Sequence, residues 1–391
     1  MRRSCTVWTV VVLATLVVLA SCKQGVPAPE RMDPVSHDEA KAFAAAFAAA
    51  ISPCDAGKLD TLIDRETLLR RALQHSKVTG ALKDGIARGL RTSSLGQLLC
   101  RGLGQDAHYA LLRIKDDGGV PRPFFRLVAS GAVNYHELEL GKSRKDHQVR
   151  ALDIRVYATG DLLSESLTQM IDQAAEVAKS GAAASDFQRA AEGIQEARAR
   201  GDNAEARRLF ATVPAPLRAT KPMRLTELMI ASDLDEATYK DVMEKYRRDF
   251  PDDPSADVVA IDYFYLRRDM QGTLDAVDRL DELVDGDPYL ATLRANAYLL
   301  DPTPEHLAQA ETWARKATDA SADDENAWWS LVGVLLTRGD HAAVLPVADT
   351  LRTKFKAAID PVSMAGNELW TAHFASDAYR QWAETHAAVA P

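Results

Sequence analysis

The second half of the chain carries a repeating pattern of small and apolar residues. Between residues 184 and 388, triples of such residues recur at positions i, i+4 and i+7, a spacing that places each triple on one face of a helix. First members of successive triples are 33, 34, 37 and 34 residues apart. The triples are Ala206-Phe210-Val213, Tyr239-Met243-Tyr246, Thr273-Val277-Leu280, Ala310-Ala314-Ala317 and Val344-Ala348-Leu351. Because one helix pair cannot bury its apolar face alone, such a period predicts helix pairs that stack on one another.

The pattern resembles the tetratricopeptide repeat (TPR), whose consensus places A-x3-F-x2-A on the second helix of each pair. Single units depart from that family, since Val332 stands where Gly is expected and Ala322 where Pro is expected. The longest step contains the insertion "DPTPEH", and Gly201-Asp202 and Gly339-Asp340 fit the tight turns between paired helices. We predict an all-α, TPR-like solenoid of five or six helix pairs over residues 184–388. An unrelated α-solenoid with similar hairpins is the alternative.

Resemblance to tetratricopeptide repeats also implies a binding face, because that family uses its concave side, lined by first helices, to hold peptide segments or other subunits. Trp328 and Trp329 lie about 100° apart on a helix, so both are not expected in the core. Trp328 matches the packing position, which leaves Trp329 for the groove or a hidden contact. The partner-binding residues implied by position are Asp262, Tyr265, Asn326, Trp329, Asn367 and Trp370.

The first half of the chain changes from helical to strand periodicity. Residues 36–102 are rich in Ala and Leu at helical spacing, and four runs with strand character follow: "HYALLRIK", "FFRLVA", "AVNYHELEL" and "VRALDIRVYA". Gly- and Asp-containing turns separate these runs, as in an antiparallel meander. A further helix is expected after Gly160, with Asp161 or Ser164 as its cap. This order predicts an α+β domain over residues 36–178, in which helices pack on a curved antiparallel sheet.

The predicted domain resembles the cone-shaped NTF2/cystatin-like folds. More narrowly, "SGAVNYHELEL" followed by "ALDIRVYATGDLLSESL" is similar to an uncharacterised domain that precedes helical repeats in other bacterial lipoproteins. That resemblance covers about 70 residues. It implies a fold and an arrangement of domains, and it carries no chemistry that could be transferred to this chain.

Strand alternation in "NYHELEL" identifies the one candidate polar site of this domain. The parity that turns Leu138 and Leu140 inward also turns Asn134 and His136 inward, while Tyr135, Glu137 and Glu139 should point outward. An inward histidine could act as a general base in a ligand pocket or hydrolytic site. The alternative is a hydrogen-bonded core residue, and no carboxylate can be assigned to the histidine, because Asp153 alternates with Leu152 and Ile154 and is expected to face out.

Signatures of catalysis and of metal binding are missing from the sequence. There is no H-E-x-x-H, G-x-S-x-G or S-x-x-K motif, and the nine histidines lack metal-ligand spacing. We therefore expect no catalytic residue, no metal and no cofactor.

The N-terminus carries an apolar run that ends at a cysteine. After Arg2 and Arg3, the run from Val7 to Ala20 is too short to span a membrane well, since its helix would measure about 21 Å against a hydrocarbon core of roughly 30 Å. It has the form of a signal peptide, residues 1–21. Residues 19–22, "LASC", resemble the lipobox of bacterial lipoprotein precursors, which implies cleavage before Cys22 and its acylation. The alternative is an ordinary secretory signal in which Cys22 is incidental.

By analogy with that family, Lys23 after the cysteine favours the periplasmic face of the outer membrane. Residues 22–35 then form a Pro-containing tether. Export also bears on the other cysteines, because Cys54 and Cys100 are the pair that remains. In an oxidising compartment they suggest one disulfide, which would stabilise by about 4 kcal/mol in the chain-entropy model. Two buried free thiols are the alternative.

Charge divides the chain unevenly. Residues 22–180 carry a net charge of +2, whereas residues 181–391 carry −13, with 23 Lys and Arg against 36 Asp and Glu. Nucleic acid is therefore not expected as a partner of the acidic half, because phosphate binding needs a basic surface. Solubility alone is the other explanation for an acidic surface.

Together these features predict an interaction or scaffold protein, anchored by lipid in the cell envelope, whose repeats bind a polypeptide or an envelope protein complex. A small-ligand-binding or hydrolytic function of the N-terminal cone, around Asn134 and His136, is the alternative function.

The lipobox resemblance gives a direct test. Cys22→Ala should abolish acylation and leave an uncut or soluble product, because each buried acyl methylene contributes ~0.8 kcal/mol of membrane affinity. Extraction of membranes with and without detergent, and mass spectrometry of the N-terminus, would measure the change. A Cys5→Ala variant should behave like the wild type. Unchanged membrane extraction after Cys22→Ala would rule out the anchor.

Overall fold

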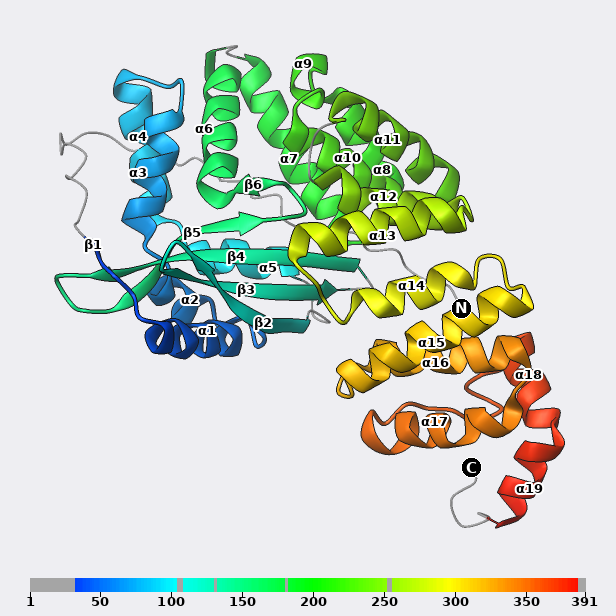
Figure 1. Cartoon of the computed structure of the whole chain (residues 1–391). Helices are drawn as coiled ribbons and strands as arrows, with labels where there is room; N and C mark the ends of the chain where they lie inside the picture. Colours follow the sequence, from blue (N-terminus) through cyan, green and yellow to red (C-terminus); the bar gives the residue numbers. More distant parts are fainter. Residues whose placement is uncertain (1–31, 104–107, 130–131, 180–181, 252–254, 386–391) are drawn as a thin grey trace. The chain divides into compact units, whose positions relative to one another are not determined.

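The computed structural model describes residues 32–103, 108–129, 132–179, 182–251 and 255–385 (Figure 1). The expected signal peptide and Cys22 lie outside the described residues. Within the described part of the chain, no helix is long and apolar enough to cross a membrane. The described residues divide into two compact units, one ending at Val258 and the other beginning at Val259.

The first unit contains an antiparallel sheet with the strand order β2-β3-β4-β5-β6, and β1 pairs with β4 away from that path. Two consecutive glycines, Gly118 and Gly119, make the β2–β3 turn with φ of +61° and +86°, which a tight hairpin requires. All four predicted strand runs are confirmed. Met32 and Asp33, predicted as tether, instead pair with Ser143 and Lys142 of β4. The strands are β1 (Met32–Asp33), β2 (His108–Asp117), β3 (Val120–Ala129), β4 (Ala132–Ser143), β5 (Val149–Val156) and β6 (Asp161–Leu162).

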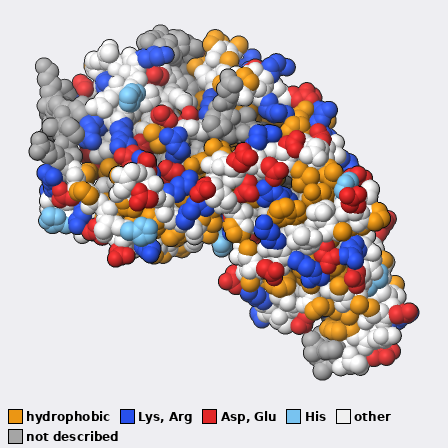
Figure 2. Space-filling model, in the orientation of Figure 1, with side chains coloured by type: hydrophobic (Ala, Val, Ile, Leu, Met, Phe, Trp, Pro, Cys, Tyr) orange, Lys and Arg blue, Asp and Glu red, His pale blue; other side chains and the backbone are white. Residues whose placement is uncertain are grey.

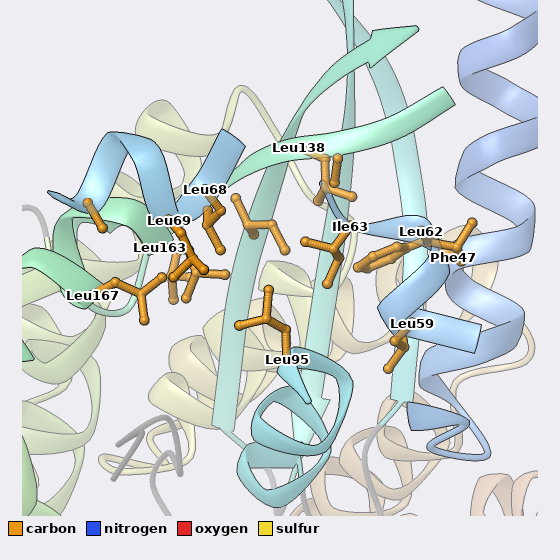
Figure 3. Packing of buried hydrophobic residues seen from close by; sticks show 14 of the residues in the cluster. Phe47, Leu59, Leu62, Ile63, Leu68, Leu69, Leu95, Leu138, Leu163 and Leu167 are labelled. Carbon is orange, nitrogen blue, oxygen red and sulfur yellow. The ribbon is translucent and has the colours of Figure 1, made fainter. Parts of the chain in front are cut away.

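Helices before and after the strands cover this sheet, so the mixed α+β class is confirmed. Helix α1 contacts β2, β3 and β5, and α2, α3 and α6 contact β5. Leucines from several of these helices meet Leu138 of β4 in the core (Figure 3). The helices are α1 (His37–Ile51), α2 (Ala56–Leu62), α3 (Arg65–His75), α4 (Gly80–Thr92), α5 (Leu95–Leu103) and α6 (Leu163–Lys179).

Helix α1 shows how the sequence specifies this arrangement. Ser36 and Glu39 form a capping box, in which each side chain binds the backbone N–H of the other residue. Phe43 and Phe47 lie one turn apart on the buried face, and the Phe47 ring contacts the rings of Tyr109 and Phe125 on the sheet. The helix is therefore held at its start by local hydrogen bonds and along its length by aromatic packing.

A buried polar network joins α3, the sheet and α6. Arg71 of α3 donates to both carboxylate oxygens of Glu139, at 2.6 and 2.8 Å, and to Asp153 at 3.2 Å. Asp153 also accepts from the backbone N–H and hydroxyl of Ser164, in the first turn of α6. The outward orientation predicted for Asp153 is thus wrong, because α3 and α6 cover this carboxylate. Asp153 also supplies the capping contact that we had expected from Asp161 or Ser164. The Arg71 hydrogen bonds lower the pKa of Glu139.

Helices in pairs make up the rest of the chain, and six pairs are present in the described residues from 182 onward, with the single-turn α9 between the first two. They are α7 (Ala182–Ala199) with α8 (Asn203–Thr212), α10 (Lys221–Ser232) with α11 (Glu236–Asp249), α12 (Ser255–Leu266) with α13 (Met270–Val284), α14 (Leu290–Tyr298) with α15 (Pro304–Ala320), α16 (Glu325–Arg338) with α17 (His341–Lys354), and α18 (Glu368–Ala375) with α19 (Asp377–Thr385); α9 is Ala215–Arg218.

Every residue of the five predicted triples is buried, on or at the end of α8, α11, α13, α15 and α17. The turn before each of these helices also repeats. An Asp or Thr stands at each N-cap, and its side chain accepts from a backbone N–H of the first turn. Such caps stabilise a helix by about 1 kcal/mol each. These N-cap residues are Asp202, Asp235, Asp269, Thr303 and Asp340.

Cys54 and Cys100 lie at disulfide distance, with their Cα atoms 5.5 Å apart. The bridge connects the turn after α1 to α5. At the same place, a Cβ on Gly96 would lie 2.1 Å from the carbonyl oxygen of Ala56, so glycine permits the close approach of α5 to α2. The predicted pairing of the two cysteines is therefore compatible with the packing around them.

This bridge should be measurable as stability. The double variant Cys54→Ser/Cys100→Ser should lose about 4 kcal/mol of unfolding free energy, because the 46-residue loop is no longer closed. Urea unfolding of oxidised wild type, reduced wild type and the double variant would measure this, and the last two should agree. Alkylation of both cysteines in unfolded protein that has seen no reductant would show that they are free thiols.

Candidate functional site

Asn134 and His136 lie on the helix-facing side of β4, as strand alternation predicted. Their cross-strand neighbours are Leu127 for Asn134, and Phe125 and Val156 for His136, and all three neighbours belong to the hydrophobic core. The His136 side chain is only 5% exposed. Both predicted polar residues therefore reach the interior of the first unit.

Hydrogen bonds fix the protonation of His136. The Asn134 Oδ1 atom accepts from the backbone N–H of Ala158 at 2.9 Å, so its Nδ2 atom faces His136 Nε2 at 3.0 Å. An amide nitrogen only donates, and Nε2 must therefore be the unprotonated ring nitrogen. His136 Nδ1 then carries the proton and lies 3.2 Å from the Tyr109 hydroxyl oxygen. Both ring nitrogens have a partner within the core.

The electrostatics of this cluster oppose proton transfer. Burial lowers the pKa of His136 to about 4 and raises the pKa of Tyr109. At neutral pH the imidazole is uncharged, and its basic nitrogen is occupied by Asn134. Asp153 is held by Ser164 and Arg71 and does not pair with His136. This geometry favours a hydrogen-bonded core histidine over a general base.

The opposite side of β4 is also covered at Tyr135. Its ring stacks on Phe124, and Tyr157 meets both rings edge-on. The parity prediction for Tyr135 is correct as a face of the sheet, but the side chain is buried. Glu137, on the same face, accepts from Lys115 and from the Tyr157 hydroxyl. Alternation along a strand therefore predicts which side of the sheet a side chain lies on, but it does not predict whether that side chain is exposed to solvent.

Among the groove residues implied by the repeat resemblance, Trp370 is misplaced. Its side chain is 2% exposed and packs against Trp329, His373 and Phe374. Asn367 is the N-cap of α18, and its side chain accepts from the backbone N–H groups of Leu369 and Trp370. Position in a repeat therefore assigned a core ring and a helix cap to the binding face.

Trp329 and Asn326 keep the character expected of surface residues on a first helix. Asn326 is exposed, in the first turn of α16. Trp329 is half-buried, and its indole N–H donates to Glu325 at 2.9 Å while its ring meets the edge of Trp370. On α12, Asp262 and Tyr265 are half-buried and make further contacts. The structure thus brings Trp329 and Trp370 into contact and leaves Asn326 open to solvent.

One polar cluster was missed by sequence reasoning. His341, Arg352 and His373 gather where α17, α18 and α19 meet, although 32 residues separate the two histidines in the sequence. The available signal was the placement of His373 within the apolar helix "ELWTAHFA", where a histidine must be buried. Among the described residues, no group of three or more His, Cys, Asp or Glu side chains could hold a metal ion.

Surface charge is mixed on the face shown in Figure 2, where basic and acidic side chains are interspersed. A phosphate backbone would find no continuous basic area on that face.

The burial of Trp370 leads to a stability prediction. Trp370→Ala should lower the free energy of unfolding by about 3–5 kcal/mol, the cost of emptying a core site of its aromatic ring. Trp329→Ala should cost less, because the ring is only half-buried, and Asn326→Ala should change stability by less than about 0.5 kcal/mol. Chemical denaturation of the three variants would measure this order. A Trp370→Ala protein as stable as wild type would contradict the burial.

Comparison of the chain with protein-family models, with curated proteins and with solved structures finds no match. Membership of a tetratricopeptide, NTF2-like or lipoprotein family therefore rests on the sequence resemblances alone. What the chain does has to be inferred from its own residues.

Proposed function

We propose that this chain is a lipid-anchored interaction protein of the cell envelope and that its TPR-like repeats hold a polypeptide partner. The observation that carries the proposal is the regular series of helix pairs, with five buried triples and five repeated N-caps at a step of 33 to 37 residues, which is the pattern of a stack of repeats. A stack of this kind places equivalent helices side by side and creates an extended surface, which suits a segment of polypeptide better than a small molecule.

Residues of the first helix α16 give this surface its most specific features. Asn326 offers an exposed amide, which can bond to the backbone of a bound segment. Trp329 lies one turn further along and is half-buried, with Trp370 behind it as a rigid support. A tryptophan held in one orientation loses little conformational freedom when it binds, and such rings dominate many interfaces.

Charge gives the partner a chemical character. The net charge of −13 over residues 181–391 favours a partner whose contacting segment is basic, since opposite charges accelerate encounter. The lipid anchor is supported by the resemblance of residues 19–22 to a lipobox, and it would keep the repeats at a membrane surface.

The alternative function, a ligand-binding or hydrolytic site around Asn134 and His136, receives less support. Its histidine is uncharged at neutral pH and has both ring nitrogens occupied. A role for the α+β region as a spacer or docking surface needs no such chemistry, and we assign it that role.

Photo-crosslinking tests which helices meet the partner. A photoreactive residue at Asn326, on the first helix α16, should crosslink in cell envelopes to one defined polypeptide. The matched control is Asp349, which is exposed on the second helix α17 of the same pair and should give little product. Trp329→Ala should reduce the Asn326 crosslink at least tenfold. Equal crosslinking from Asn326 and Asp349, or none from Asn326, would contradict binding along the first helices.

A further inference from the structure

The junction of α17, α18 and α19 holds buried polar atoms without hydrogen-bond partners among the described residues. His373 is 0% exposed, and neither of its ring nitrogens has a partner. The same holds for both terminal nitrogens, Nη1 and Nη2, of Arg352, and for Nδ1 of His341. A buried polar group without a partner costs about 1–3 kcal/mol, more if charged, so native proteins rarely retain several together.

Arg294 and His136 show that an arginine and a histidine buried in this protein can have their terminal nitrogens satisfied. Arg294, which is also largely buried, donates to Asp278 at 2.7 Å and to Asp281 at 2.8 Å. His136, as deeply buried as His373, has a partner on each ring nitrogen. Arg352 has one contact of this kind, from Nε to the carbonyl oxygen of Ile359 at 3.0 Å. Elsewhere in the described residues such atoms occur one to a residue, as with the Nε atoms of Arg65 and Arg198, whereas at this junction both ring nitrogens of His373 and both Nη atoms of Arg352 are unpartnered.

The two histidine rings and the aromatic rings around them lie close together. The rings of His341 and His373 are 5.6 Å apart, and the Tyr379 ring lies 5.4 Å from His373. The guanidinium of Arg352 lies over the ring of Trp382, at 5.2 Å. Trp370 and Phe374 pack against the other edges of His373. Aromatic rings thus border both the His373 imidazole and the Arg352 guanidinium.

The charged groups around His373 and Arg352 are not balanced by a contacting carboxylate. Burial first, and then the charges of His341 and Arg352, lower the pKa of His373 to about 4. Burial also lowers the pKa of Arg352. The carboxylate of Asp360 is engaged elsewhere, because it accepts from Val362 and from Ser363. Asp349 and Asp360 raise the pKa of Arg352 through space, but among the described residues neither carboxylate forms an ion pair or a hydrogen bond with its guanidinium.

The ligand that would satisfy these groups is an anion and not a metal ion. A metal ion would be repelled by the guanidinium, and no acidic side chain completes a ligand set there. An oxyanion would accept from both groups, since a neutral histidine donates one N–H and an arginine donates from each Nη. The Nε atom of Arg352 already donates to Ile359, so its Nη1 and Nη2 atoms are left to donate. Two such nitrogens of one guanidinium can pair with the two oxygens of one carboxylate.

We propose that the α17–α19 junction is a binding site for a carboxylate, held end-on by the Nη1 and Nη2 atoms of Arg352 and by N–H groups of His341 and His373. A monoanion matches the single guanidinium. The carboxylate can belong to a free small acid or to the C-terminus of a peptide, and both share this chemistry.

Titration of the purified full chain tests the site. With histidine side chains labelled with ¹⁵N, acetate should shift the NMR signals of His341 and His373 saturably and leave those of His136 unchanged. The melting temperature should rise by a few degrees in acetate over sodium chloride of equal ionic strength. Both effects should vanish in Arg352→Met and persist in Arg315→Met, which removes an exposed guanidinium that pairs with Glu311.

Two further probes identify the source and the class of the anion. A short peptide with a free C-terminus, compared with its amidated form, separates a peptide carboxylate from a free acid, since only the free form should compete with acetate. Inorganic phosphate should bind more weakly than acetate. Unchanged signals of His373, equal shifts of His136 and His373, wild-type titration in Arg352→Met, or stronger binding of phosphate would each overturn the carboxylate assignment. If Arg352→Met fails to fold, the comparison of His373 with His136 in the wild type still decides.

Discussion

Burial of one apolar face per helix is the constraint on which the rest of this structure depends. In α15 the face is made of Ala310, Ala314 and Ala317, whose small side chains allow α14 and α16 to approach closely. In α1 the same device appears as Ala40 and Ala44, which alternate with phenylalanines against the sheet. Neither apolar face stabilises the fold alone, because in an isolated helix pair or an uncovered sheet the apolar side chains stay exposed to water. Each element therefore needs the next.

Regular periodicity explains which parts of the fold could be predicted from the sequence. The four strand runs and the five triples were predictable because each depends on local spacing. In a strand every second side chain lies on the same face, and in a helix side chains three or four residues apart do so. Asp153 and Trp370 could not be placed in this way. Their burial depends on Arg71 and Ser164 in one case and on Trp329 in the other, and each of these residues belongs to a different element of the fold. Spacing identifies a face, whereas contact between elements decides what covers that face.

Buried polar groups were the least predictable part of the candidate sites, because their partners are far away in sequence. The environment of His136 depends on Tyr109 and on the backbone of Ala158, neither of which the strand pattern identifies. The cluster of His341, Arg352 and His373 depends on three helices meeting at one junction. A histidine in an apolar helix can be recognised from sequence as buried. Whether its nitrogens are satisfied becomes visible only in three dimensions.

The contrast between the two buried histidines indicates where chemistry remains open in this chain. His136 is neutral because it is buried, and its surroundings supply a donor on one nitrogen and an oxygen on the other, so the core gains nothing from a ligand there. His373 is kept neutral by burial and by neighbouring positive charge, and both Nη atoms of Arg352 lack a hydrogen-bond partner among the described residues. An anion would neutralise the guanidinium and satisfy the imidazoles at once, and it would also fix α17, α18 and α19 relative to one another. Binding at this junction would therefore be coupled to the order of the last helix pairs, which places ligand recognition in the repeats and leaves structural support to the α+β region.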